Sequence, residues 1–279
     1  MKSTEKIGKK ATLVTDGELK YIEFECLKKY NDKLIHCVST RYGGVSQGEC
    51  RSLNLGFNRN DTRDNVVQNY QLLCNSIGVK TDSIVLTNQL HDINVAVIDE
   101  KDKGKGFSRR SDLIGIDGLL TTSPGVTMVT FHADCVPVFL FEPGINAAAL
   151  LHSGWRGTLK NIASSALTAM REIPGFRADR LVAAIGPSID KCCFEVDEDV
   201  YKLFENKFDN VQLYTPVGDK KWNIDLKEII KLELLSEGMQ ENNIHDCGIC
   251  TKCRKDLFFS YRGDDRRTGS FAAFMQIKE

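Results

Sequence analysis

The sequence lacks the short motifs that mark several large enzyme classes. It contains no G-x-G-x-x-G, no G-x-x-x-x-G-K-[ST] and no H-E-x-x-H segment, so dinucleotide oxidoreductases, P-loop NTPases and zincin metalloproteases have no support. Net charge is also nearly absent, because 37 Lys and Arg residues stand against 38 Asp and Glu residues, which gives −1 at pH 7. A chain without a strong field of one sign does not attract nucleic acid or an anionic membrane. We therefore expect small-molecule partners, with no nucleic acid and no membrane.

Long apolar runs and an export signal are missing as well. No stretch is apolar for the length of a membrane-spanning helix, and the lysine-containing residues 1–10 are not followed by an apolar signal core. These absences predict a soluble cytoplasmic protein. Ten cysteines are spread thinly through 279 residues, whereas disulfide frameworks are typical of small secreted chains. We interpret the cysteines as reduced thiols.

The hydrophobic pattern that is present is typical of an α/β fold. Residues 126–130, 136–141 and 147–151 are nearly continuous apolar runs, as expected for strands that are covered on both faces. Residues 64–77 carry apolar side chains at helical spacing and end at Gly78, which predicts an amphipathic helix. Further expected strands are 18–26, 34–40, 83–86, 93–98, 181–185, 258–262 and 271–277, and further expected helices are 158–172, 198–205 and 226–236. Because there is no internal repeat or Pro-rich linker, the simplest account is one α/β domain over residues 1–279.

Three residues next to expected strands offer metal ligands. His91 precedes the strand-like residues 93–98, Cys135 precedes the apolar run 136–141, and His152 follows the run 147–151. Ligands gathered from distant strands are typical of catalytic zinc sites, whereas structural zinc sites more often use close Cys-x₂-Cys pairs. Two imidazoles and one thiolate suit Zn²⁺ and leave a fourth position for water or substrate. We therefore predict an open catalytic zinc site.

Polar residues beside these ligands have competing interpretations. His132 and Cys135 are an odd number of residues apart, so in an extended segment their side chains point to opposite faces. We therefore place His132 in the core or behind the ligands. Asp134 either orients backbone or a histidine, or is an ordinary turn aspartate. Gln89 lies on the same face as His91 in an extended chain and is a candidate to hydrogen-bond a bound ligand.

The segment after residues 147–151 predicts an anion site. It reads His-Ser-Gly-Trp-Arg-Gly-Thr at 152–158, a glycine-rich turn that leads into the helix expected from Thr158. Unpaired N–H groups at a helix start, the positive end of the helix dipole and the Arg156 guanidinium would all favour a phosphate or an oxyanion. The alternative is a tight strand-to-helix turn in which Arg156 pairs with a surface carboxylate.

A Cys-x₂-Cys-x₂-Cys run at 247–253, with His245 nearby, is compatible with a zinc knuckle or part of an iron–sulfur site. The bacterial ferredoxin spacing would need a further Cys at the position of Leu257. A metal in this run is therefore the less favoured interpretation. The adjacent Cys192 and Cys193 are expected to pack as small hydrophobic residues.

Eight short motifs occur in the order found in one known family. They are T-R-x-G-G-V-S (40–46), S-L-N-L (52–55), Q-x-H (89–91), D-G (117–118), A-D-C-x-P (133–137), H-S-G-W-R-G-T (152–158), G-P-S-I (186–189) and F-F-S-Y-R (258–262). On these motifs the chain resembles the laccase-domain, or multicopper polyphenol oxidase-like, family of purine nucleoside phosphorylases, also called peptidoglycan editing factor. The resemblance implies one α/β domain of layered mixed β-sheets flanked by helices, with His91, Cys135 and His152 as metal ligands. The family usually has an arginine at the position of Ser270, so this chain lacks any contribution that the arginine makes in its relatives.

The resemblance also implies an activity, because members of the family phosphorolyse adenosine, guanosine, inosine and methylthioadenosine and deaminate adenosine. Deamination would use zinc-activated water, although the deaminase signature H-x-E…P-C-x-x-C is missing. Phosphorolysis would need phosphate held by Arg156 and the glycine-rich helix start, with Arg41 and Asn54 as further substrate-binding candidates together with Gln89. Candidate catalytic residues are Cys135, Asp134 and Arg156.

Three other functions stay open. Cys135 could be the nucleophile of a hydrolase that edits peptidoglycan precursors, although a metal-bound thiolate would be poorly available for attack. A copper-dependent phenol oxidase is a second alternative, since Cu²⁺ could occupy the same ligands, but five histidines are too few for a multicopper laccase. A binding protein without catalysis is the third. The oligomeric state is open.

Overall fold

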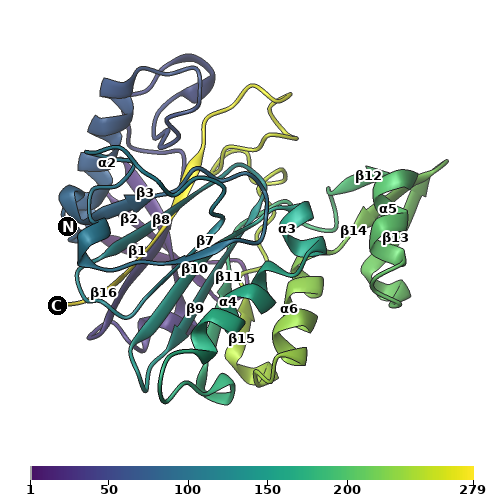
Figure 1. The fold of residues 1–279 in the computed structure, drawn as a ribbon. Coiled ribbons are helices and arrows are strands. Elements are labelled where there is room, and N and C mark those ends of the chain that lie inside the picture. Colours follow the sequence, from purple (N-terminus) through teal and green to yellow (C-terminus); the bar gives the residue numbers. More distant parts are fainter. Residues whose placement is uncertain (1) are drawn as a thin grey trace.

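Two mixed β-sheets are stacked face to face and covered by helices in the computed structural model, which describes residues 2–279 (Figure 1). The layers run from α2 (Arg63–Ile77) through the first and second sheets to α4 (Ile162–Arg171) and α6 (Leu226–Ser236). A smaller three-stranded sheet with α5 (Glu198–Glu205) projects from the second sheet's side of the molecule. The predicted class, layered mixed sheets flanked by helices, is confirmed.

The first sheet has seven strands in the order β1-β2-β3-β4-β16-β8-β5. These are β1 (Ser3–Ile7), β2 (Ala11–Asp16), β3 (Leu19–Phe24), β4 (Leu34–Ser39), β5 (Ile84–Leu86), β8 (Thr127–His132) and β16 (Phe271–Ile277). Neighbouring strands are antiparallel except β5 and β8, which are parallel. One face packs against Tyr70 and Leu73 of α2, because alternate residues such as Val129 and Phe274 point to that side.

The second sheet has six strands in the order β15-β11-β9-β10-β7-β6. These are β6 (Val95–Val97), β7 (Gly118–Thr121), β9 (Val136–Glu142), β10 (Ala147–Ser153), β11 (Val182–Ile185) and β15 (Ile244–Asp246). Along β9, Phe139 and Phe141 face the first sheet, whereas Val138 and Leu140 face the layer of α4 and α6. Both faces are therefore buried, which explains the continuous apolar runs of β9 and β10.

The projecting sheet consists of β12 (Glu195–Asp197), β14 (Lys221–Ile224) and β13 (Tyr214–Gly218), in that order. The ring of Tyr201 in α5 stacks on Trp222 with centroids 4.2 Å apart. Two short helices complete the chain, α1 (Glu25–Lys28) and α3 (Trp155–Leu159). The projecting sheet joins the second sheet through the segment after β11, which also borders the site described below.

The predicted elements of regular periodicity are confirmed, including 64–77, 136–141 and 271–277. Two predictions are wrong. Residues 258–262 form turns rather than a strand. The helix expected at 158–172 is divided into α3 and α4 by Asn161, whose left-handed φ of 67° interrupts a helix. Strands β1, β2, β12, β13, β14 and β15 were not predicted. All of these except β2 are short or largely exposed and carry little apolar alternation, whereas β2 is a buried strand that the sequence analysis missed.

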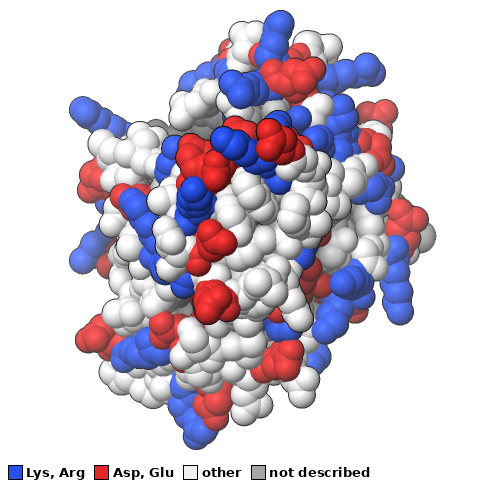
Figure 2. Space-filling model, turned by 90° about the vertical axis from the view of Figure 1, so that its right-hand side faces the viewer, with Lys and Arg blue, Asp and Glu red and all other residues white. Residues whose placement is uncertain are grey.

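Charge is mixed over the face of the molecule that Figure 2 shows. Lys and Arg side chains there are interspersed with Asp and Glu side chains, and no large area of one sign forms. This agrees with the balanced composition of the chain. Within residues 2–279, none of the helices combines the length and apolar character needed to span a bilayer.

Candidate metal centre

His91, Cys135 and His152 converge although they come from three separate segments. His91 lies in the turn between β5 and β6, Cys135 directly precedes β9, and His152 belongs to β10. Their donor nitrogen and sulfur atoms all lie within 4.8 Å of one another. Donor atoms of a tetrahedral zinc site are roughly 3.3–3.8 Å apart for Zn–N and Zn–S bonds of about 2.0–2.3 Å. A small movement of the side chains would therefore let all three bind one ion.

Strand register explains why two of the ligands meet. In the antiparallel pair of β9 and β10, Ser153 is opposite Val136, so Gly154 follows as the neighbour of Cys135. A Cβ atom at Gly154 would lie 2.8 Å from Cδ2 of His91 and 3.2 Å from Sγ of Cys135. Only glycine leaves the ligands room at this position, which means that the backbone itself forms one wall of the centre.

Asp117, directly before β7, orients two of the ligands. Its Oδ1 accepts hydrogen bonds from Nδ1 of His152 at 2.8 Å and from the backbone N–H of His91 at 3.0 Å. Its Oδ2 accepts from the backbone N–H groups of Leu90 and Asp92 at 3.0 and 3.1 Å. Because Nδ1 of His152 is engaged, Nε2 is the nitrogen left for a metal. Asp117 also holds the turn in which His91 has a left-handed φ of 62°.

The sequence analysis did not assign a role to Asp117. Its only signal was the Asp-Gly pair in the motif series, and the register of β7 with β10 is what places it opposite His152. Burial alone would raise the pKa of Asp117, but the hydrogen bond and the charge of His152 hold that pKa below its ordinary value. The residue is thus an anionic partner that a neighbouring imidazole stabilises.

The thiol of Cys135 is activated by its two histidine neighbours. Burial opposes ionisation of the thiol, but the charge and hydrogen bond of His152, followed by those of His91, lower the pKa of Cys135 below its ordinary value. In return, Cys135 and Asp117 raise the pKa of His152 against the effect of burial. A thiolate is the form that binds a metal or attacks a substrate.

His132 lies behind the ligands, as predicted, but not for the predicted reason. The segment 133–135 bends instead of continuing in an extended form, and Asp134 has a φ of 90°. His132 is buried, with Nδ1 3.1 Å from the carbonyl oxygen of Cys135 and Nε2 2.8 Å from Oγ1 of Thr130. Both ring nitrogens therefore have partners within the protein, and neither is available to a metal.

Asp134 connects the centre to a distant segment of the chain. Its Oδ1 accepts hydrogen bonds from the hydroxyls of Thr251 and Ser260 at 2.6 and 2.7 Å, and its Oδ2 accepts from the backbone N–H of Arg262 at 2.7 Å. Of the two predicted roles, the structure corresponds to the orientation of backbone. No histidine is among these partners.

Gln89 lies in the cavity wall, but its amide joins two loops. Its Nε2 donates to the carbonyl oxygen of Phe131 at 3.0 Å, and its Oε1 accepts from the N–H of the same residue at 2.7 Å. This pair of bonds fixes the turn that carries His91 against the end of β8. The expected contact with a bound ligand would have to use the remaining amide hydrogen.

A cavity of about 970 Å³ opens onto the three ligands, within the range that protein pockets for small molecules span. Four arginines are among its lining residues, Arg59, Arg156, Arg262 and Arg266. Aromatic rings line it as well, at Phe57, Phe131, Trp155, Phe194 and Tyr261. The cavity therefore offers flat apolar surfaces beside several positive charges.

Arg156 lies at this cavity, where an anion-binding residue was predicted. The helix begins at Trp155, three residues earlier than expected, so Arg156 belongs to its first turn. The guanidinium carbon lies 4.2 Å from the centre of the Trp155 ring. Attraction between a guanidinium and an aromatic face holds the exposed Arg156 side chain beside Trp155, and both residues line the cavity.

Arg59 was not predicted and reaches the cavity from the loop before α2. Its Nε donates to Oγ of Ser270 at 2.8 Å. Ser270 is the position at which the resemblance implied an arginine in relatives, and Arg59 brings a guanidinium next to it. No local sequence pattern marks Arg59, because it depends on the approach of two segments 211 residues apart.

Arg41 and Asn54 lie outside the cavity lining, in contrast to their predicted roles in substrate binding. Nη1 of Arg41 donates to the carbonyl oxygen of Lys255 at 3.0 Å, and its guanidinium lies over Phe259. Asn54 is fully buried, and its Oδ1 accepts from the N–H groups of Gly56 and Ser270 at 3.0 and 2.9 Å. Both residues stabilise the loops that surround the cavity.

Fold and site together define an α/β protein with a His₂Cys centre at the base of a cavity lined by arginines. The chain belongs to the family described as multi-copper polyphenol oxidoreductase laccase, whose model matches residues 35–278. It is 31% identical over 270 residues to the purine nucleoside phosphorylase YlmD of Bacillus subtilis (strain 168), covering 96% of this chain and 97% of that protein. The resemblance inferred from the motifs is confirmed.

Two further comparisons agree with this assignment. The adenosine deaminase RL5 from an unknown prokaryotic organism is 34% identical over 194 residues, which cover 68% of this chain and 73% of that protein. The crystal structure of YlmD from Geobacillus stearothermophilus matches with a TM-score of 0.90 at 28% sequence identity, covering 99% of this chain and 100% of that one.

Proposed function

We propose that this protein is a zinc-dependent purine nucleoside enzyme, which phosphorolyses adenosine, inosine, guanosine and methylthioadenosine and deaminates adenosine. The observation that carries the proposal is the convergence of His91, Cys135 and His152 at the base of a cavity lined by arginines. One relative, 31% identical over 96% of this chain, is named purine nucleoside phosphorylase. Another, 34% identical over 68% of this chain, is named adenosine deaminase.

The donor set fits zinc. Two imidazoles and a thiolate of lowered pKa are ligands that Zn²⁺ prefers, and three protein ligands leave one position open. Cu²⁺ could bind the same atoms, since affinity alone does not discriminate against it. Zinc held there would supply a Lewis acid that activates water or polarises a substrate oxygen. Asp117 keeps His152 in the tautomer this binding needs and keeps His91 in place.

The cavity walls suit both substrates of phosphorolysis, the purine nucleoside and phosphate. Aromatic rings such as those of Phe131, Trp155 and Tyr261 would contact the flat purine. The guanidinium groups of Arg156 and Arg59 would bind phosphate, because charge-assisted bonds to guanidinium are strong and can be bidentate. In this proposal Asp134 is a positioning residue, which holds the segment at 251–262 against the centre.

The alternatives have less support from the same residues. A multicopper cluster would need further imidazoles, but His132 has both nitrogens engaged and His36 accepts from the backbone N–H of Phe24 in the core. Cys135, His152 and Asp117 do have the order of nucleophile, base and orienting carboxylate that a cysteine hydrolase would use. A bound metal would withhold that thiolate from attack.

The test is product analysis by mass spectrometry, with zinc-quantified protein and adenosine in the presence and absence of phosphate. We expect adenine and ribose 1-phosphate only with phosphate, inosine without phosphate, and inosine together with hypoxanthine when phosphate is present. Cys135→Ala should abolish all of these products, whereas Cys74→Ala, a buried cysteine of α2, should retain them. Fully metallated protein that forms no product from any of the four nucleosides would refute the proposal. Peptidoglycan precursors would then be the next substrates to test.

A further inference from the structure

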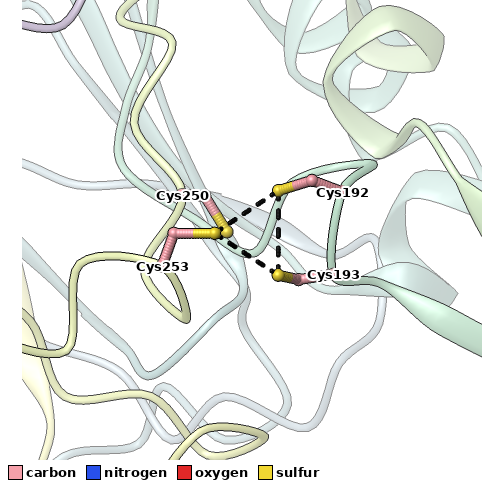
Figure 3. A group of neighbouring side chains, drawn as sticks. All are labelled: Cys192, Cys193, Cys250 and Cys253. Carbon is pink, nitrogen blue, oxygen red and sulfur yellow. Dashed lines mark hydrogen bonds between the residues drawn. The ribbon is translucent and has the colours of Figure 1, made fainter.

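Four cysteine sulfurs meet outside the cavity described above. Cys192 and Cys193 follow β11, whereas Cys250 and Cys253 follow β15, and the two pairs face each other (Figure 3). We call these residues the four-cysteine cluster. All four Sγ atoms lie within 4.8 Å of one another. Two segments about 60 residues apart in the sequence thus bring four soft ligands to one point.

This arrangement corrects two predictions made from the sequence. Cys192 is exposed and Cys193 half-buried, so the pair does not pack as small hydrophobic residues. The run at 247–253 contributes only its second and third cysteines, because Cys247 is buried apart from the cluster. His245 does not belong to the cluster either, and its Nδ1 lies 3.2 Å from Nζ of Lys10.

The sulfur spacing matches the coordination sphere of a single ion. The Sγ atoms of Cys192 and Cys193 are 3.7 Å apart, and Sγ of Cys253 is 3.6 and 3.5 Å from them. In a tetrahedral zinc site with Zn–S bonds of about 2.3 Å, neighbouring sulfurs are roughly 3.8 Å apart. A disulfide would require about 2.05 Å, and an iron–sulfur cluster would hold those thiolates that bind different irons farther apart.

We propose that Cys192, Cys193, Cys250 and Cys253 bind a structural zinc ion as four thiolates, separate from the His₂Cys centre. Four protein ligands close the coordination sphere, as in structural sites, whereas the three ligands at the centre leave it open. The site is thus expected to hold the fold and to take no part in turnover. This inference does not depend on the proposed function.

The charge around the cluster is compatible with such an ion. Zinc with four thiolates carries a net charge of −2, which is more stable near cations. Lys191 directly precedes the first pair, and Lys252 and Arg254 flank Cys253. Lys191 donates to the carbonyl oxygen of Gln212 and Arg254 pairs with Asp256, so Lys252 is the neighbour that can offset this charge. Two of the ligands are exposed, so a metal can enter from solvent without opening the core.

Other contacts already join the same two segments. Ser188 and Cys250 form an isolated parallel bridge. Lys227, buried in α6, donates to Oδ2 of Asp190 at 3.1 Å and to the carbonyl oxygen of Ile249 at 3.2 Å. The metal would complete this junction at the solvent side, where Cys192 and Cys253 are exposed.

The junction also supports the wall of the main cavity. Phe194, which lines the cavity, directly follows Cys193, and Thr251, which binds Asp134, lies between Cys250 and Cys253. The chain then continues to Tyr261 and Arg262 at the cavity. Fixing the four cysteines would therefore fix both sides of this wall.

The test is metal counting by mass spectrometry on the full chain, purified under reducing conditions from zinc-supplemented cultures. We expect Cys250→Ser/Cys253→Ser to hold one zinc ion fewer per chain than the wild type. Cys247→Ala is the matched control, because it changes a nearby cysteine outside the cluster, and it should keep the wild-type zinc count. An equal zinc count in the wild type and the double variant would overturn the proposal, and so would iron in place of zinc.

A second measurement covers the case in which the double variant does not fold. His91→Ala/His152→Ala leaves the four-cysteine cluster intact, so it should retain one tightly bound zinc. Substitution of that ion by Co²⁺ should give the intense sulfur-to-cobalt absorption of a tetrathiolate site. Loss of all metal from this variant would overturn the proposal. Four fewer free thiols than the sequence predicts, in denatured protein that was never exposed to reductant, would instead indicate two disulfides and would also overturn it.

Local mobility provides a readout that metal counting does not. If zinc joins the two segments, hydrogen exchange should become faster at residues 188–194 and 249–262 in Cys250→Ser/Cys253→Ser, with little change in β9 and β10. Unchanged exchange in both segments would contradict the structural role of the ion.

Discussion

Nδ1 of His152 lies 2.8 Å from Oδ1 of Asp117, and the same oxygen accepts a hydrogen bond from the backbone N–H of His91. One carboxylate thus orients one metal ligand through its ring and a second through its backbone. This relationship depends on the register of β7 with β10. Asp117 is therefore expected to contribute to metal affinity without binding the metal itself.

Asp117→Asn should weaken zinc binding by about 10- to 100-fold, since an amide supports the imidazole less well than a carboxylate does. The measurement is competition with a chromophoric chelator at constant pH. Asp92→Asn is the matched control, because Asp92 lies half-buried in the same turn and its side chain pairs with Lys160 instead of a ligand. Equal affinity in the wild type and Asp117→Asn would contradict the role assigned to this carboxylate.

Gly154→Ala should reduce zinc occupancy and catalytic activity together, because the new Cβ would lie 2.8 Å from Cδ2 of His91. Either that ring or the β10 backbone must then move away from the binding position. The control is Gly218→Ala, where no heavy atom lies within 4 Å of an added Cβ. Zinc titration by calorimetry measures the effect. Wild-type affinity in Gly154→Ala would show that the glycine is not required.

Arg156→Ala should raise KM for phosphate by roughly 10-fold or more, since a hydrogen bond to a charged group contributes about 1.5–3 kcal/mol. Adenosine deamination, which uses no phosphate, should change less. Arg110→Ala, at an exposed arginine outside the cavity lining, is the control. Steady-state kinetics of adenine release at varied phosphate checks the prediction. An unchanged phosphate dependence would exclude Arg156 from phosphate binding.

Glu233→Gln should stabilise the protein in mildly alkaline solution. Burial raises the pKa of Glu233 to about 8, and neither carboxylate oxygen has a hydrogen-bond partner in the described residues. Between the ordinary carboxyl pKa and about pH 8, the folded state binds a proton that the unfolded state has released, so wild-type stability falls as pH rises. Glu233→Gln cannot ionise at this position, so its stability does not fall in this way. The loss of unfolding free energy in the wild type is on the order of a few kcal/mol when Glu233 is fully ionised.

Urea unfolding at a series of pH values measures this difference. The gap in unfolding free energy between Glu233→Gln and the wild type should widen from pH 5 to pH 8 and then level off. Glu228→Gln, at a half-buried position of the same helix, should show no comparable change. A gap that does not vary with pH would mean that Glu233 titrates normally.

Hydrophobic periodicity predicted the parts of the fold whose burial is regular. The strand runs at 136–141 and 271–277 and the amphipathic pattern at 64–77 agree with β9, β16 and α2. The break between α3 and α4 was not predicted, because Asn161 adopts a left-handed conformation that no local pattern requires. The polar hairpin of β13 and β14 was missed for a related reason, since its exposed residues carry little alternation.

The ligand types and their positions next to strands were readable from the sequence, and so was the family. His91, Cys135 and His152 were identified in this way, and the structure brings them together. Arg41 and Asn54 belong to the same series of motifs, but they support loops rather than line the cavity. Motifs record which residues a fold requires without distinguishing contact with a ligand from support of the backbone.

By itself the sequence determined which segments are buried and which side chains can bind a soft metal, because both depend on residue type and local spacing. Tertiary structure alone decided that Asp117 lies opposite His152 and that Cys192 and Cys193 face Cys250 and Cys253. Both results depend on strand register and on the approach of segments far apart in the chain. Periodicity reports how deeply a residue is buried but not which distant residue it meets.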